Sequence, residues 1–176
     1  LVATKMMESE SVPIAFITSS EGNTGLVFPP HWQKSGQSYS SLVSTFNSSG
    51  VDDAIAILWH QGETDVNNGV TDDSYAIALQ DMLDDLQSDL NVPSLQLVCA
   101  NLGYKTTGGV TRENLDAIRL GQLEACAADP DILCGPILYD IGPLADGVHF
   151  QTNEELTNLA DRWWRMLGHH FYGLIG

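Results

Sequence analysis

An aspartate and a histidine three residues apart, Asp146 and His149, are the side chains in this sequence best suited to acid–base chemistry. A carboxylate at this spacing can accept a hydrogen bond from Nδ1 of the imidazole, which fixes the tautomer and leaves Nε2 free to take a proton. The same Asp-Gly-Val-His segment also suits a simple turn at Gly147, with His149 packed on the helix that follows. The pair therefore favours catalysis only if other polar segments join it.

A second polar segment runs from His60 to Asp65 and follows a wholly apolar stretch. Gln61 offers amide donors that could hold a developing oxyanion. Gly62 permits close approach of the backbone, and Glu63 would be costly to bury without hydrogen bonds. The alternative is a polar turn in which Glu63 and Asp65 are solvated, and composition alone does not reject it.

A third segment, Ser19 to Gly25, reads Ser-Ser-Glu-Gly-Asn-Thr-Gly. Its glycines expose backbone N–H groups, so the loop could bind a phosphate or an oxyanion. It lacks both the Gly-Lys-Ser/Thr ending of a P-loop and the glycine spacing of a dinucleotide fingerprint, which disfavours nucleotides. An ordinary turn is the alternative interpretation.

Apolar runs and helical patterns alternate along the rest of the chain. Short apolar runs predict buried strands at 12–18, 54–59, 95–100 and, more weakly, 136–141. Helices are expected at 41–50, from Thr71 onwards, from Thr111 to about 128, and after the capping box of Thr152 and Glu155. The apolar faces of the second and fourth helices are predicted to be Tyr75, Leu79, Met82, Leu83, Leu86 and Leu90, and Leu156, Leu159, Trp163, Trp164 and Leu167.

Strands separated by helices of this length predict a mainly parallel, flavodoxin-like sheet with helices on both faces, a three-layer α/β/α sandwich. We expect residues 1–176 to form a single domain. In such sheets ligands bind at the carboxyl ends of the strands. The three polar segments fall at those ends, so they are expected to converge on one edge of the sheet.

The charge balance of the chain narrows the classes of ligand. It has 23 acidic and 7 basic residues, a formal net charge of −16. Nucleic acids and anionic membranes both require basic patches, so neither is an expected partner. Neutral sugars or esters are more plausible ligands.

No apolar run approaches the roughly 18 residues that span a bilayer. The start of the chain has no signal-peptide pattern and no initiator Met, which suggests a processed or truncated protein.

The three cysteines, Cys99, Cys126 and Cys134, have neither the spacing of a zinc site nor the even number of a full disulfide framework. A bridge between Cys126 and Cys134 and a set of buried thiols are both open interpretations.

Together, the polar segments resemble the conserved blocks of the SGNH (GDSL-like) hydrolases. His-Gln-Gly-Glu-Thr-Asp at 60–65 resembles the third block of the branch that contains acetylxylan esterases and sialate O-acetylesterase-like proteins. Asp-Gly-Val-His-Phe at 146–150 resembles the last block, 12–25 resembles the second, and Ile-Arg-Leu-Gly-Gln-Leu-Glu-Ala at 118–125 resembles a glutamine-bearing helix of the branch. The resemblance covers nearly the whole chain, in the right order.

The resemblance implies a role for each matching residue. His149 would be the general base that activates a serine, and Asp146 would orient it. The side chain of Gln61 and the backbone N–H of Gly22 would be oxyanion-hole donors. Glu63 would support the site through hydrogen bonds, and His60 and Asn23 are further supporting candidates. The family uses no metal and no organic cofactor.

The chain departs from the family pattern in two places. Gly22-Asn23-Thr24 stands where the family usually has two glycines. The first block, a strand leading into the nucleophilic serine, has no counterpart: Ser19 and Ser20 have no helix after them, and Ser38 has no apolar strand before it. We therefore expect an N-terminal companion segment or chain to carry the serine, and expect the chain to fold with that companion.

The leading hypothesis is a serine esterase that removes O-acetyl groups from an acetylated glycan or a small acetyl ester. The alternative is a catalytically inactive SGNH-like binding or structural module in a larger assembly, and a flavodoxin-like binding protein is a third possibility. The sequence does not define the compartment, although an extracellular or secreted location is the expectation.

Overall fold

The computed structural model describes residues 15–142 and 144–173. The helices are α2 (Gln37–Ser48), α3 (Glu63–Asn67), α4 (Asp72–Asp89), α5 (Arg112–Ala128) and α6 (Asn153–Tyr172), and the strands are β1 (Ala56–Trp59), β2 (Gln96–Asn101) and β3 (Ile132–Ile137). No helix in the described ranges is both long enough and apolar enough to cross a membrane.

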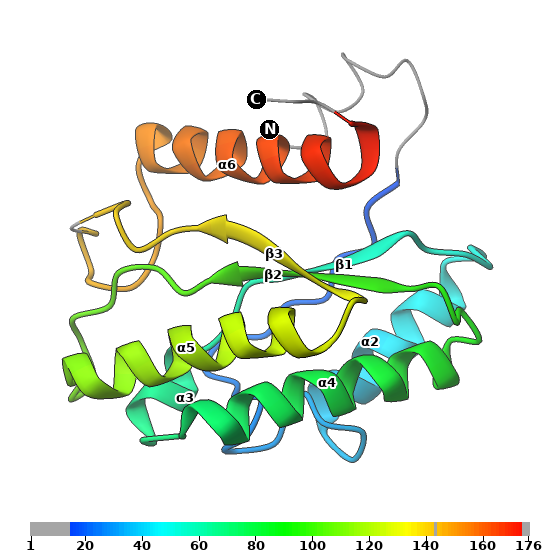
Figure 1. The fold of residues 1–176 in the computed structure, drawn as a ribbon, viewed down its shortest axis with the longest axis horizontal. Helices are drawn as coiled ribbons and strands as arrows, with labels where there is room; N and C mark the ends of the chain where they lie inside the picture. Colours follow the sequence, from blue (N-terminus) through cyan, green and yellow to red (C-terminus); the bar gives the residue numbers. More distant parts are fainter. Residues whose placement is uncertain (1–14, 143, 174–176) are drawn as a thin grey trace.

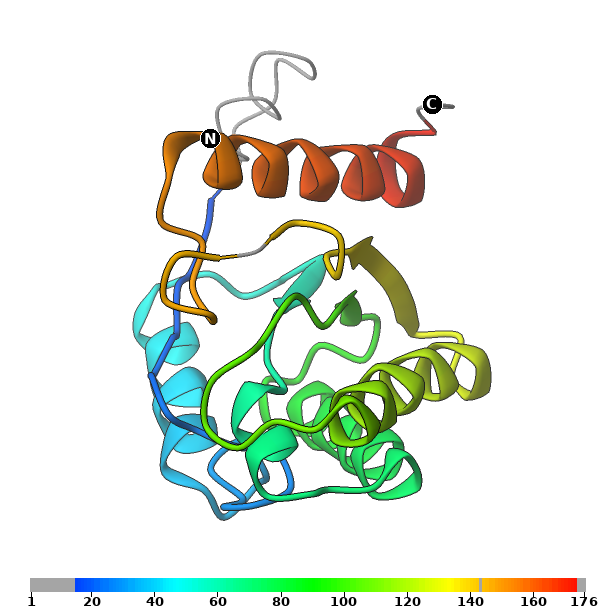
Figure 2. The same cartoon turned by 90° about the vertical axis from the view of Figure 1, so that its left-hand side faces the viewer.

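The three strands form one parallel sheet in the order β1-β2-β3. Helix α6 covers one face of the sheet, and α2, α3, α4 and α5 lie on the other (Figure 1). Viewed from the side, the sheet separates α6 from the other helices (Figure 2). The chain therefore has the predicted three-layer α/β/α fold with a parallel sheet.

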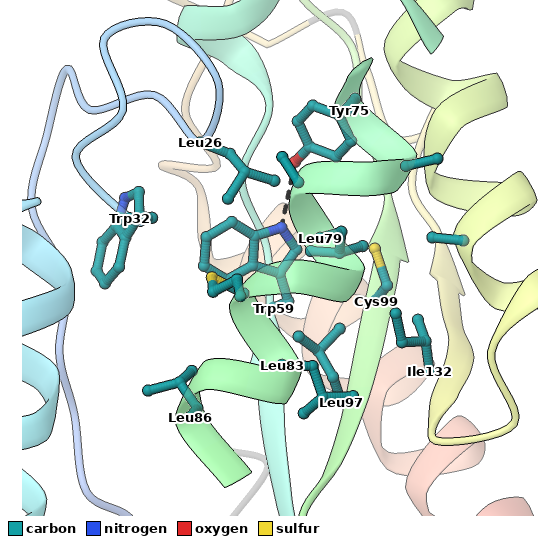
Figure 3. Packing of buried hydrophobic residues seen from close by; sticks show 14 of the residues in the cluster. Leu26, Trp32, Trp59, Tyr75, Leu79, Leu83, Leu86, Leu97, Cys99 and Ile132 are labelled. Carbon is teal, nitrogen blue, oxygen red and sulfur yellow. Dashed lines mark hydrogen bonds between the residues drawn. The ribbon is translucent and has the colours of Figure 1, made fainter. Parts of the chain in front are cut away.

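Two hydrophobic clusters hold these layers together. The larger one lies between the sheet and α4 and α5, and contains the fully buried Tyr75, Leu79 and Leu97 (Figure 3). The smaller one joins β2 to α6 through Val98, Ala100, Trp163 and Leu167. Because successive side chains of β2 point to opposite faces, Leu97 and Cys99 serve the first cluster while Val98 and Ala100 serve the second.

The predicted helix starts are confirmed by their caps. The hydroxyls of Thr71 and Thr111 accept hydrogen bonds from backbone N–H groups three residues on, and Thr152 and Glu155 form the expected capping box. All six apolar positions predicted for α4 are buried. On α6, Trp163 and Leu167 are buried and Leu159 and Trp164 are half-buried. The prediction for Leu156 was wrong, since it is 37% exposed near the start of the helix.

The strands β1 and β2 lie within two residues of their predicted bounds, and three other predicted elements differ more. The last strand is 132–137 rather than 136–141, because the turn after α5 is short and Ile132 already pairs with Leu97. The predicted helix at 41–50 begins four residues earlier, at Gln37. Residues 15–18 of the predicted first strand are not a strand and are largely exposed, while 12–14 lie outside the described residues.

Candidate active site

Asp65 is the polar centre of the loops at the carboxyl end of β1. Its carboxylate is fully buried and accepts hydrogen bonds from the backbone N–H groups of Leu26, Val27 and Phe28 at 2.8, 2.9 and 3.0 Å. A fourth bond comes from Nε2 of Gln61 at 2.9 Å. The sequence left open a solvated Asp65. The four hydrogen bonds instead offset the cost of burying this carboxylate. Three of them hold residues 26–28 beside α3.

Gln61 joins the 19–25 segment to the 60–65 segment. Its Nε2 donates to the carbonyl of Thr24 at 2.8 Å as well as to Asp65, so both amide hydrogens have acceptors within the protein. The Tyr75 hydroxyl lies 3.0 Å from Oε1 of Gln61 and receives a hydrogen bond from Trp59 Nε1 at 3.2 Å (Figure 3). The 19–25 and 60–65 segments are thus brought together, with Gln61 9% exposed between them.

Gln122 of α5, the glutamine in the 118–125 segment that resembles the family, holds the 60–65 segment in place. It is 1% exposed. Its Oε1 accepts from the backbone N–H of Leu102 at 2.8 Å, and its Nε2 donates to the backbone carbonyl of Gln61 at 3.0 Å. One side chain therefore fixes the ends of both β1 and β2 to α5.

Asp146 and His149 are hydrogen-bonded as predicted. Oδ2 of Asp146 lies 2.7 Å from Nδ1 of His149, and Oδ1 accepts from the backbone N–H groups of Val148 and His149 at 2.9 and 2.8 Å. The His149 backbone N–H, its ring and the Val148 N–H hold the pKa of Asp146 well below its usual range. The carboxylate stays ionised and orients the ring, while Nε2 of His149 has no partner among the described residues. The His149 side chain is 74% exposed.

The 146–150 segment meets the 60–65 segment through aromatic rings. The ring of His60 lies 5.8 Å from the ring of Phe150, the residue after His149. Nε2 of His60 is buried without a hydrogen-bond partner in the described parts of the chain, and Oε1 of Glu63 is 3.9 Å away. Burial lowers the pKa of His60, so the ring is neutral. Glu63 is half-exposed and makes no hydrogen bond to a described residue. Asp65 makes the contacts that the resemblance implied for Glu63.

Gly22 and Asn23 form the exposed tip of the 19–25 segment. Asn23 has φ 61°, the left-handed conformation that asparagine tolerates better than most residues. This explains how asparagine can stand where the family usually has glycine. Neither the Gly22 N–H nor the Asn23 amide has a hydrogen-bond partner among the described residues, while Thr24 beside them is held by Gln61 and Trp32.

None of the serines noted in the sequence, Ser19, Ser20 and Ser38, makes a hydrogen bond to His149. Ser19 and Ser20 lie in irregular chain, and the next helix begins only at Gln37. Ser38 is 1% exposed and donates a hydrogen bond to Oε2 of Glu21 at 2.7 Å, which is a structural contact.

The turn at Gly147 depends on the absence of a side chain. Its φ is 78°, and a Cβ there would lie 2.5 Å from Oγ1 of Thr106, on the neighbouring loop whose backbone N–H donates to Gly147 O at 2.9 Å. Gly147→Ala should therefore displace His149 as well as incur the left-handed strain of about 1–2 kcal/mol. Gly109→Ala is the matched control, since Gly109 has φ 74° with no atom within 4 Å of its Cβ position.

The expected result is that G147A disturbs the NMR signals of the Asp146–His149 pair and G109A does not, while both lose a similar amount of stability from strain. Unchanged His149 signals in G147A would show that Thr106 moves aside and that the turn does not position the histidine.

The fold and these loops define an α/β protein with a parallel sheet and a hydrogen-bonded Asp146–His149 pair in the loop after β3. A family described as carbohydrate esterase, sialic acid-specific acetylesterase, matches residues 2–162. The chain belongs to this carbohydrate esterase family.

Known relatives agree with this assignment. The probable carbohydrate esterase At4g34215 of Arabidopsis thaliana is 27% identical over 119 residues, which are 66% of this chain and 42% of that protein. The crystal structure of the A. thaliana protein AT4G34215 superposes with a TM-score of 0.81 at 23% identity, over 97% of this chain and 67% of that one. A Xanthomonas citri carbohydrate acetylesterase gives 0.76 at 19% identity, over 98% and 40%. The two structures share the fold, and the matched region spans less than half the length of the curated relative.

Proposed function

We propose that the chain supplies the acid–base half of a serine esterase that removes O-acetyl groups from a carbohydrate. The observation that carries this proposal is the Asp146–His149 hydrogen bond of 2.7 Å, with Nε2 of His149 unpartnered among the described residues. This arrangement suits a general base, because the carboxylate favours the tautomer with the proton on Nδ1 and leaves Nε2 to accept one. Membership of a carbohydrate esterase family supports an acetylated glycan, or a small acetyl ester, as the proposed substrate.

In the proposed reaction His149 takes the proton of a serine hydroxyl as the serine attacks the acetyl carbonyl. Asp146 stabilises the imidazolium that forms, and the proton then passes to the leaving sugar oxygen. His149 next activates a water that hydrolyses the acetyl-serine and releases acetate. No step requires a metal or an organic cofactor.

The oxyanion of each tetrahedral intermediate needs N–H donors. The N–H of Gly22 and the amide of Asn23 are suited to this role because they are exposed and make no bond to a described residue. Gln61 could donate only by exchanging its bond to Thr24 or Asp65. We therefore assign Gln61 to holding the 19–25 loop in place, and retain it as a second donor only if the loop rearranges.

The serine is proposed to come from a companion segment that packs beside β1. That strand forms one edge of the sheet in the described part of the chain, and Ile55 at its start is 66% exposed. An unpaired strand edge is a template for a further strand. A strand ending in a serine-bearing turn beside β1 would bring its hydroxyl to the same sheet edge as His149.

Expressing residues 1–176 with and without the upstream coding segment tests this proposal. The isolated chain should hydrolyse 4-nitrophenyl acetate and acetylated xylo-oligosaccharides negligibly above background, because the nucleophile is missing. The assembly should turn over both, and a Ser→Ala change in the upstream segment should abolish this.

Robust turnover by the isolated chain that disappears in Ser19→Ala or Ser20→Ala would overturn the companion assignment. An assembly that folds, binds acetylated glycan and turns over no ester would identify the chain as a binding module instead.

A further inference from the structure

The three cysteines gather on the side of the sheet that faces α5. Cys99 on β2 is in direct register with Cys134 on β3, so their side chains lie on the same face. Cys126, near the end of α5, is half-buried and packs against the core cluster that includes Cys99. All three are free thiols in the structure. The bridge left open by the sequence is therefore not formed.

Cys126 and Cys134 are nevertheless close neighbours. The chain between them is short, since α5 ends at Ala128 and β3 begins at Ile132. Cys126 on α5 packs against the core cluster on the face of the sheet toward which Cys134 of β3 also points. Burial, and after it the neighbouring Cys134 thiol, raises the pKa of Cys126. The three thiols differ in access: Cys134 is exposed, Cys126 is half-buried and Cys99 is 2% exposed.

We propose that Cys126 and Cys134 are a reversible disulfide site that joins the end of α5 to strand β3. This inference is independent of the esterase activity proposed above. The oxidant is a small disulfide such as oxidised glutathione. The exposed Cys134, as thiolate, attacks one sulfur of that disulfide, forming a mixed disulfide and releasing one glutathione thiolate.

Cys126 then resolves the intermediate. After losing its proton it attacks the Cys134 sulfur, which forms the Cys126–Cys134 bond and releases the second glutathione. The two protein thiols are oxidised by two electrons, and one glutathione disulfide is reduced to two thiols. Cys99 takes no part, because its side chain is 2% exposed and its sulfur is shielded from the oxidant.

The bridge would strengthen the scaffold behind the candidate site. Cys126 lies one helical turn after Gln122, whose side chain holds the Gln61 carbonyl and the Leu102 N–H. Strand β3 leads into the loop that carries Asp146 and His149. A covalent link between α5 and β3 thus joins the two elements that position opposite sides of the site.

The test treats the purified protein with oxidised glutathione, alkylates the remaining thiols after unfolding without reductant, and maps the peptides by mass spectrometry. The expected product carries a Cys126–Cys134 link with Cys99 alone alkylated. Cys99→Ser should oxidise like the wild type, and Cys126→Ser and Cys134→Ser should form no internal link. The short closed loop should raise the Tm of the oxidised form by roughly 5–10 °C, reversibly with dithiothreitol.

Several results would overturn the inference. They are a stable glutathione adduct on Cys134 without resolution, a Cys99–Cys134 link, or three alkylated cysteines after full treatment. None of these outcomes depends on esterase turnover, so the disulfide and the proposed reaction succeed or fail separately.

Discussion

Replacing His149 with alanine should lower kcat of the complete esterase by roughly 10⁴-fold or more, the range seen when the base of a serine triad is removed. The residual rate would come from the oxyanion donors and substrate binding alone. KM should change little, because an exposed imidazole whose task is proton transfer contributes mainly in the transition state. Steady-state kinetics on an acetylated oligosaccharide, with the nucleophile-bearing segment present, measure this.

Two further variants make the result specific. Asp146→Asn keeps the shape of the turn but loses the charge that orients the ring, and should cost about 10²–10⁴-fold in kcat. His169→Ala, an exposed histidine in the last turn of α6, is the matched control and should be silent. H149A turnover within a few-fold of wild type would remove His149 from the mechanism.

The ionisation of Asp146 makes a prediction about pH. Its folded pKa is depressed by bonds from the His149 backbone, the His149 ring and the Val148 N–H. A depressed pKa contributes stability that is present above the usual aspartate pKa of about 3.9 and is lost as the pH falls through the folded value. Asp146 therefore stays charged at mildly acidic pH, so the hydrogen bond that orients the His149 ring is expected to persist there, and NMR of the Asp146 carboxyl against pH measures this.

Much of the fold was readable from local pattern. The helix starts at Thr71, Thr111 and Thr152 were predictable because a cap and an amphipathic stripe are both short-range signals. The Asp146–His149 bond was predictable for the same reason, since both residues lie in one turn. The last strand was misplaced because its start is set by pairing with β2, and a sequence window does not contain the partner strand.

The hydrogen-bond network around Asp65 could not be predicted from local sequence patterns. Asp65 is fully buried because three backbone N–H groups almost forty residues away in sequence converge on it. Nothing within the Gln-Gly-Glu-Thr-Asp segment distinguishes this carboxylate from that of Glu63. The signal that existed was indirect: a short polar segment directly after a buried strand must contain at least one paired polar group. The sequence identified the segment but not the residue.

Asp65→Ala should destabilise the protein by about 3–5 kcal/mol, because it removes a buried charge and leaves its donors without an acceptor. Four hydrogen bonds are lost at once, and the N–H groups of Leu26 and Val27 stay buried or half-buried where water cannot easily replace the carboxylate. A loss of this size is a large part of the roughly 5–15 kcal/mol that holds a domain together.

Urea denaturation of the assembled protein, followed by tryptophan fluorescence, measures the change, and Trp32 and Trp59 near this network provide the signal. Asp52→Ala, an exposed aspartate before β1, is the matched control and should change stability by no more than about 0.5 kcal/mol. Asp65→Asn tests the charge separately from the volume. Its amide turns a donor toward the Leu26 N–H or the Gln61 amide, so it should lose nearly as much as the alanine variant. If both variants lost less than about 1 kcal/mol, the N–H groups of Leu26, Val27 and Phe28 would have other acceptors, and Asp65 would not be what holds the 19–28 loop beside the candidate site.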